Sequence, residues 1–572
     1  MDAATRFDTH IVGALPVICD YLERLQLGKI IDESVPWEGE VPLGTIIEVM
    51  VINRLLNPKA MFRIDDWAQN TALMEYFGLE PGQLNDDRLG RALERVAAHM
   101  DKVQAPLVLR MIKEFKLNVS QVHFDITSVE LFGAYETATK PEPEPTAAPT
   151  APPAAAAPPA AGAQAAATTD AATAPAPTYG HAKSGRKNVK QIQLGINVVG
   201  DGGVPVAHKA LDGNTAEATT HIENLRRLRA LLPKEDFLYI ADSKLDTAEN
   251  LLMVEASQGK FLCAGVFHPE HQKYFRRNRK KLRTIDYCPK SQQQLPPEKR
   301  DAYKAFETTE CVTGKVDGRT VHMKHRLVFV WSEAKAKQEA QTRERHLAKI
   351  RSEFETVTRN LNKYTLKTAD VIRRRLESAR TKYAEGKLFE YELTEERSGK
   401  FALTWKIKKK DLEERKLLEG IYVLKSSLSK RSFPLPKLLA KYKEQIQVER
   451  RIHHLKGPLA VTPMFLEKPE RMAGLLCVLV WALAVLALME RQVRRNLKGK
   501  PMYGLYPENR PSSAPTGPAI LERFSTLCIV IMKHRGTIQR RLAQPDEIQQ
   551  RLLRLLGIPP DTLQTFKRRC GM

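Results

Sequence analysis

The sequence predicts a multidomain protein of mixed α and β structure (α+β/αβ), with helical regions at both ends. Between them we expect a mixed-sheet core that a large inserted domain interrupts. Near both ends, apolar residues recur every three or four positions, which is typical of helices. In the middle, short apolar runs alternate with turn residues, and a long charged segment separates two groups of such runs. The 572 residues suffice for about two to four domains.

The composition favours a nucleic-acid partner inside a reducing compartment. The formal net charge is +23 and the pI is about 9.6, so the preferred partners are polyanions, first nucleic acid and second an anionic membrane surface. The seven cysteines are scattered and form no C-x-x-C pair. This argues against a disulfide framework and against a structural zinc site, and it favours a reducing cytosol.

Residues 1–118 are predicted to be a helical N-terminal domain. The expected helices cover 11–27, 43–56 and 88–115, with Pro and Asn between them. Asn85, followed by two aspartates, is a signal for the start of a helix. The domain is either an ordinary helical bundle or a domain that binds DNA ends.

Residues 119–267 are predicted to form the first part of the core. A strand over 119–131 carries Asp125 in its middle, where a charge is costly unless it is paired or metal-bound. Later elements are expected as a hairpin, a helix, a strand ending at Asp242, a second helix and a last strand, over 191–199 with 204–211, 216–232, 236–241, 247–258 and 261–267. This order matches the ribonuclease H-like layout.

A flexible segment is expected inside this part of the core. Residues 137–178 are almost only Pro, Ala and Thr, a composition that cannot form a packed core. The basic, glycine-containing turn that follows carries Lys183 and Arg186. These two side chains either contact the DNA backbone or belong to a solvated loop.

Residues 268–417 are predicted to be an inserted domain. A basic run over 271–283 includes Arg276 and Arg277, which are candidates for DNA-backbone contacts. Further elements are expected as a strand, two charged helices and a hairpin, over 321–331, 332–387, and 389–393 with 401–408. Trp331 and Trp405 could stack on a flipped base, but core packing is the ordinary reading.

Residues 418–495 are predicted to be the second part of the core. A strand over 420–424 leads to a helix over 442–456. At about 100° per residue, one sector of this helix is apolar, and the sector beside it carries polar groups. The apolar residues are Val448, Ile452, Leu455 and Leu459, and the polar ones are Tyr442, Gln445, Glu449, His453 and Lys456. Alone, this pattern describes an amphipathic surface helix.

The uncharged segment 472–489 has two possible readings. Its eighteen residues are at the short limit for a membrane span, and they also suit a buried core helix, which we expect. After it, 496–572 is predicted to be a basic helical C-terminal region with a helix over 519–556. That region could contact DNA or mediate dimerisation.

Three acids point to a metal-dependent reaction on phosphodiesters. Asp125, Asp242 and Glu449 follow one another on a strand, a strand end and a helix. Carboxylates can hold two divalent ions about 3.5–4 Å apart, which activate water or a 3′-hydroxyl and stabilise the leaving oxygen. Mg²⁺ suits such a site because it takes oxygen ligands. Asp246 and Glu130 lie nearby in sequence, and we interpret them as structural or solvated.

At this point the chain resembles the DDE transposases of bacterial insertion sequences that carry a Tyr-x2-Arg-x3-Glu-x6-Lys signature. Here the signature stands as Tyr442-x2-Gln445-x3-Glu449-x6-Lys456, with every spacing kept and glutamine at the arginine position. The turns at 179–186 and 212–215 are also similar to elements of that group.

The resemblance implies that Asp125, Asp242 and Glu449 are catalytic and hold two Mg²⁺ ions, for which Mn²⁺ can substitute. It also implies that Tyr442 and Lys456 contact terminal phosphates. Gln445 lacks the charged fork of arginine and would hold a phosphate more weakly, and the neighbouring Arg450 and Arg451 would compensate only in part.

The implied function is cleavage of double-stranded DNA at the terminal inverted repeats, followed by attack of the freed 3′-hydroxyl on target DNA. A hairpin on the opposite strand is one possible intermediate. The implied partner is a second copy in a synaptic homodimer, at the nucleoid in a bacterial cytoplasm and without a membrane. The alternative is a transposase-derived DNA-binding protein that has lost catalysis. His123 and His453 are either packed residues or phosphate contacts.

Overall fold

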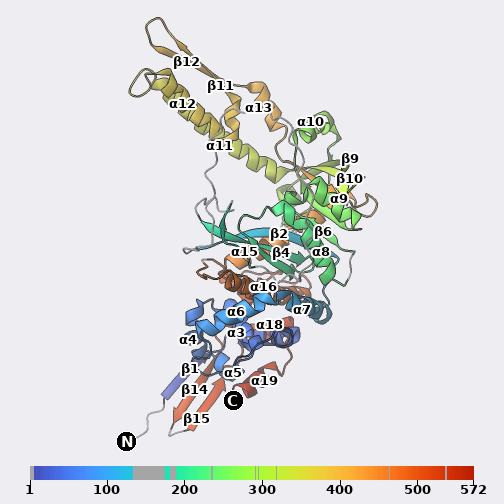
Figure 1. Ribbon diagram of the computed structural model, residues 1–572, viewed down its shortest axis with the longest axis vertical. Helices are drawn as coiled ribbons and strands as arrows, with labels where there is room; N and C mark the ends of the chain where they lie inside the picture. The colour runs from blue at the N-terminus through green and yellow to red at the C-terminus, as the bar shows by residue number, and fades with distance from the viewer. Residues whose placement is uncertain are drawn as a thin grey trace, which may run out of the picture. The chain divides into compact units, whose positions relative to one another are not determined.

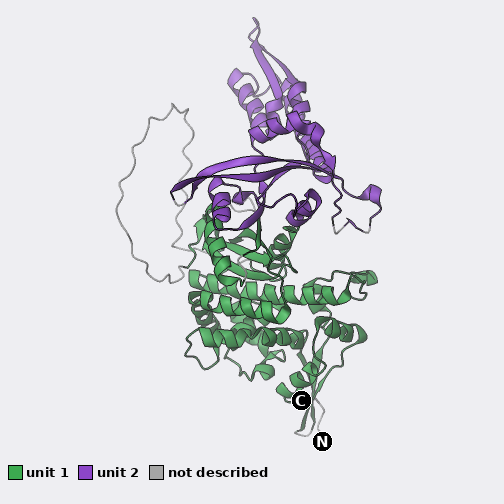
Figure 2. Ribbon diagram, turned by 90° about the vertical axis from the view of Figure 1, so that its right-hand side faces the viewer, with its two compact units in different colours: residues 1–240, 444–572 green, residues 241–443 purple. Residues whose placement is uncertain are grey.

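The protein is described by a computed structural model that covers residues 6–132, 174–180, 189–233, 236–289, 292–293, 295–316, 318–462, 464–534 and 537–572. The chain divides into two compact units (Figure 2). Unit 1 consists of Met1–Ile240 with Glu444–Met572, and unit 2 is Ala241–Lys443. Unit 2 contains the predicted insertion 268–417 and extends beyond it at both ends. Most of the expected flexible segment lies outside the described residues.

The N-terminal region of unit 1 is mainly helical, as predicted, and several of its elements, such as α3, α6 and α7, are labelled in Figure 1. It comprises β1 (Arg6–Ile11), α1 (Leu15–Leu25), α2 (Leu27–Ser34), α3 (Leu43–Leu56), α4 (Ile64–Gln69), α5 (Leu73–Phe77), α6 (Asp86–Ala98) and α7 (Met100–Phe115). The helix expected over 88–115 is wrong as a single element, because the backbone at His99 leaves the helical region between α6 and α7.

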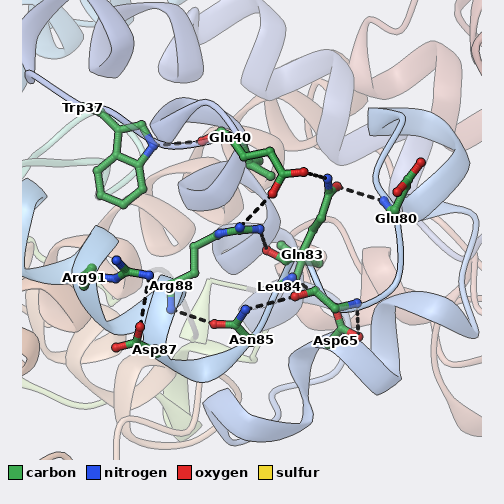
Figure 3. Close-up of polar contacts among 12 residues, drawn as sticks. Trp37, Glu40, Asp65, Glu80, Gln83, Leu84, Asn85, Asp87, Arg88 and Arg91 are labelled. Carbon is green, nitrogen blue, oxygen red and sulfur yellow. Dashed lines mark hydrogen bonds and ion pairs between the residues drawn. The ribbon is translucent and has the colours of Figure 1, made fainter.

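The predicted helix start at Asn85 is confirmed and belongs to a polar network shown in Figure 3. The Asn85 side chain accepts a hydrogen bond of 2.9 Å from the Arg88 backbone N–H, which is a standard N-cap. The Arg88 guanidinium bonds to Glu40 at 2.9 Å. Asp65 accepts the Gly82 N–H at 3.0 Å. These contacts fix the loop before α6.

The strands of unit 1 confirm the predicted core layout. In the order β3, β4, β2, β6, neighbours are hydrogen-bonded, and β5 also pairs with β4. β2 is antiparallel to β4 and parallel to β6. The elements are β2 (Gln121–Glu130), β3 (Thr178–Tyr179), β4 (Lys190–Val199), β5 (Pro205–Asp212), α8 (His221–Leu231) and β6 (Leu238–Ala241). The strand pair β4–β5 is the expected hairpin.

The long apolar helix α16 (Pro469–Leu497) is a core helix, as predicted. By length and composition it could cross a membrane, but 94% of its most apolar window is buried inside the protein. It packs against α3, α6 and β5. Its apolar surface is therefore accounted for by packing within unit 1.

Unit 2 has its own strands, in the order β7, β13, β10, β9, β8. The predicted strand, helix pair and hairpin are present, whereas β9 was not predicted. The elements are α9 (Ala248–Ala256), β7 (Lys260–Gly265), α10 (Pro269–Asn278), β8 (Arg283–Thr284), β9 (Tyr303–Val316), β10 (Arg319–Ser332), α11 (Glu333–Arg359), α12 (Ala369–Thr381), β11 (Phe389–Glu395), β12 (Phe401–Ile407), α13 (Lys409–Lys416), β13 (Ile421–Ser426) and α14 (Leu435–Lys443). Trp405 packs on Phe354 and Phe389, which favours the core reading for this residue.

The C-terminal region contains a β-hairpin that was not predicted from the sequence. The elements after α16 are α17 (Gly517–Glu522), β14 (Cys528–His534), β15 (Thr537–Leu542), α18 (Glu547–Leu556) and α19 (Thr562–Arg569). The single helix expected over 519–556 is therefore wrong. The run from Cys528 to Met532 contains three β-branched residues, and β14 pairs with β1 from the other end of the chain.

Candidate active site

The helix expected over 442–456 is divided in two. α14 ends at Lys443 in unit 2, and α15 (Ile446–Lys456) belongs to unit 1. The prediction of one continuous helix is wrong, because Glu444 and Gln445 form a turn and bond through their side chains to β2. Tyr442 is thus on a different helix from Glu449.

Gln445 has a different environment from the one predicted. Its side chain is 8% exposed. Its amide N–H donates to the carbonyl of Phe124 at 3.0 Å, and its Oε1 accepts from Nδ1 of His123 at 2.9 Å. Both ends of the amide are therefore hydrogen-bonded within unit 1, and this residue attaches the start of α15 to β2.

His123 is a packed core residue in this structure. Its ring is fully buried, and its Nε2 lies 2.6 Å from the amide nitrogen of Gln121. Gln121 also donates to the Glu444 carboxylate at 2.8 Å. A chain of hydrogen bonds thus runs from β2 into the turn before α15. The alternative reading of His123 as a phosphate contact does not fit this burial.

The inner face of α15 is held by buried groups. Val448 and Leu455 are buried, as the apolar sector predicted. Arg451 is also buried and donates to the carbonyls of Gly203 and Gly202 at 2.8 and 2.7 Å. It pairs at 2.8 Å with Glu490 of α16, whose side chain is 1% exposed. The guanidinium group of Arg451 is therefore fully used in contacts within unit 1. It is not available to replace the positive charge that Gln445 lacks at a phosphate.

The neighbouring guanidinium groups keep the buried carboxyl of Glu490 in its charged form. Burial acts to raise the pKa of the Glu490 carboxyl, but the Arg451 and Arg494 guanidinium groups hold that pKa below its ordinary value. Glu490 also accepts the Gly517 N–H at 2.7 Å. The carboxylate is thus charged and well satisfied, and it anchors α15 to α16.

The outer face of α15 presents the predicted acid together with cationic groups. Glu449, Arg450, His453 and Lys456 are all exposed. Glu449 lies in the first turn of the helix. An exposed carboxylate suits a metal ligand, and exposed cationic groups on the same helix suit contacts to phosphates.

Asp125 lies in the middle of β2, where it is half-buried. Its Oδ1 accepts the N–H of Ile126 at 2.8 Å. Because side chains alternate along a strand, Asp125 is on the same face as His123, the residue that bonds to Gln445. Within unit 1, therefore, Asp125 belongs to the face of β2 to which α15 is attached.

Asp242 is placed directly after β6, as predicted, and belongs to unit 2. Its side chain caps the short 3₁₀ helix over Ser243–Leu245 and accepts the Lys244 N–H at 2.9 Å. The three predicted acids offer the oxygen donors that Mg²⁺ prefers. Nevertheless, no group of three or more His, Cys, Asp or Glu residues within the described ranges is arranged to hold a metal ion.

A buried charge network in unit 2 holds the loop that follows Asp242. Asp246 is 3% exposed, pairs with Lys425 at 2.9 Å and accepts the Val266 N–H at 2.7 Å. Lys425 also pairs with Glu310 at 2.7 Å, and Glu310 contacts His271 at 2.9 Å. Asp246 is thus structural, as expected. The signal for its partners was the single Lys425, which directly follows the apolar run 421–424.

Hydrogen bonding within this network shifts two pKa values. The contact with His271 is the main reason that the pKa of Glu310 is lowered to about 2. The same contact raises the pKa of His271 above its ordinary value. Both groups are therefore stabilised in their charged forms.

The other residues predicted to contact DNA differ in how exposed their side chains are. Arg277 of α10 is exposed, whereas Arg276 is half-buried and lies 3.9 Å from Glu414. Tyr442 is half-buried, with its ring 6.4 Å from that of Tyr422. Trp331 packs against the cluster around Phe329, as core packing would require. Lys183 and Arg186 lie outside the described residues.

Comparison with protein families gives two matches. Residues 166–485 match the transposase DDE domain, and residues 7–105 match a domain of unknown function, DUF4277. A search of curated proteins found no match. The first range covers more than half of the chain and includes Asp242 and Glu449. Asp125 precedes it, in the strand that pairs with β4 inside the range.

Proposed function

This chain belongs to the transposase DDE domain family, and on that basis we propose that it moves an insertion sequence. Members of this family are transposition and recombination proteins that act on DNA, typically in the cytoplasm, and generally use a divalent metal. For this chain we propose cleavage at the terminal inverted repeats and transfer of the freed 3′-hydroxyl into target DNA. The family match is the observation that carries the proposal.

The proposed metal ligands are Asp125, Asp242 and Glu449. Two Mg²⁺ ions bound there would activate the attacking oxygen and stabilise the leaving oxygen, and Mn²⁺ would substitute. The attachment of α15 to β2 supports this assignment, because it keeps Glu449 on an exposed helix face and Asp125 on the strand face that the helix joins.

The proposed DNA contacts come from both units. Lys456 and His453, with Arg450 on a different side of α15, are exposed and would bind backbone phosphates of the transposon end. Tyr442, Arg276 and Arg277 would add contacts from unit 2. The formal charge of +23 supports a polyanionic partner. We further propose a homodimer that holds two ends in a synaptic complex at the nucleoid.

The test is DNA cleavage with Mg²⁺ on the element's own terminal repeats. Asp125→Ala, Asp242→Ala and Glu449→Ala are each expected to abolish strand cleavage while DNA binding is retained. Glu467→Ala is the matched control, since Glu467 is an exposed acid 11 positions after Lys456. A variant that cuts at a near wild-type rate would remove that residue from the site. Wild-type protein that binds the ends without cutting would instead indicate a DNA-binding protein without catalysis.

A further inference from the structure

Unit 1 contains a cavity of about 350 Å³ whose lining includes none of the three proposed catalytic acids. It is bounded by the start of α1, the end of α3, the α4–α5 segment, the turn after α15, and helices α16 and α17. Its apolar lining includes Leu15, Leu56, Trp67, Leu459, Leu486 and Leu521. This size and lining are typical of sites for small organic molecules.

A buried cation also lines this cavity. Arg54, in the last turn of α3, is 7% exposed. One of its N–H groups donates to the carbonyl of Lys59 at 2.7 Å, and its Nε has no hydrogen-bond partner. Within the described part of the chain, no carboxylate pairs with it. Burial lowers the pKa of Arg54 to about 10, so the side chain is still positively charged at neutral pH.

The contrast with Arg451 shows what Arg54 lacks. Both are buried guanidinium groups of unit 1, but Arg451 has a carboxylate at 2.8 Å and two glycine carbonyls. A buried charge is ordinarily paired, because removing it from water without a counter-charge is costly. Arg54 has one carbonyl for its five N–H donors. A negatively charged group in the cavity would supply the missing partner.

The other charged side chain of the lining restricts the ligand further. Glu522 lines the cavity and is exposed. Its carboxylate opposes ligands with several negative charges, such as nucleotides. A single negative charge can be neutralised by Arg54, while the aliphatic and indole side chains favour an apolar body.

We propose that this cavity is a binding site for a small organic monoanion, in which a carboxylate bonds to Arg54 and an apolar tail fills the space between the helices. The site is distinct from the proposed transposition chemistry, and neither conclusion depends on the other. The neutral amide of the same tail provides a direct comparison, because it keeps the apolar contacts and removes only the charge.

The test measures octanoate and octanamide binding to the full chain by calorimetry and by the shift in thermal unfolding. Octanoate is expected to bind at one site at least tenfold more tightly than octanamide. Arg54→Met should keep the fold and lose this preference. Arg91→Met, which changes an exposed arginine of α6 that pairs with Asp87, should keep it.

Three results would overturn the proposal: equal binding of the two probes to wild-type protein, no binding of octanoate at millimolar concentration, or a retained preference in Arg54→Met. The comparison of the probes on wild-type protein decides the matter even if Arg54→Met does not fold.

Discussion

Replacing Arg451 by methionine tests whether buried contacts, and not exposed charges, hold the helix that carries Glu449. In wild-type protein, Arg451 pairs with Glu490 and donates to Gly202 and Gly203. Methionine keeps the apolar stem but removes all of these bonds. Glu490 then remains buried with Arg494 at 3.3 Å and the Gly517 N–H as its partners.

The expected loss of stability follows from these contacts. Removing one partner of a buried ion pair costs about 3–5 kcal/mol. Arg494 still offsets part of the Glu490 charge, which favours the lower end of that range. The Gly203 carbonyl is left without its donor inside the protein, and this adds about 1 kcal/mol. We therefore expect Arg451→Met to destabilise unit 1 by about 3–5 kcal/mol.

Urea unfolding gives the global effect, and hydrogen–deuterium exchange of the α15 amides gives the local one. Arg450→Met is the matched control, because Arg450 is the adjacent residue and is exposed. It should change stability by less than about 0.5 kcal/mol. The double variant Arg451→Met/Glu490→Met should lose less than the sum of the two single variants. A loss below about 1 kcal/mol in Arg451→Met, with unchanged exchange in α15, would refute the reasoning.

Two further predictions concern residues whose environment the structure defines. Gln445→Arg places a charge where an amide is bonded to His123 and Phe124, so we expect a loss of about 2–4 kcal/mol in urea unfolding instead of tighter binding to terminal DNA. Unchanged stability with higher DNA affinity would contradict this. Glu310 stabilises unit 2 above its ordinary pKa of 4.5, and this contribution is lost as the pH falls towards about 2. His271, whose pKa is raised, stabilises below its ordinary value of 6.5 and loses this contribution as the pH rises through its folded pKa. Lys425 stays charged throughout, so the urea midpoint of unit 2 should be highest between about pH 4.5 and 6.5, and Glu310→Gln should flatten that profile.

Much of the core could be predicted because its signals are local. The strand with Asp125, the hairpin after it and the strand ending at Asp242 are each specified by a short apolar run with turn residues beside it. The apolar character of α16 follows from its composition, and the structure shows that this surface is buried inside the protein. By contrast, β14 has no local sign of its partner, because β1 lies more than 500 residues away in sequence. The helix expected over 519–556 overlooked the β-branched run Ile529–Ile531, which favours a strand, and only the pairing with β1 lay beyond local prediction.

The signature around Glu449 also could not show the break between α14 and α15, because that break depends on residues distant in sequence. Its spacing treats Tyr442, Gln445 and Glu449 as one row on one helix, which is correct only if the helix is continuous. The hydrogen bonds from Glu444 and Gln445 to β2 interrupt it, and no local pattern predicts bonds to residues over 300 positions away. Gln445 departs from the signature that this stretch resembles, and in the structure it attaches α15 to β2. Glutamine at position 445 therefore affects the position of α15 before it affects any phosphate. Measuring stability and DNA affinity in Gln445→Arg separates a role in positioning α15 from a role in phosphate binding.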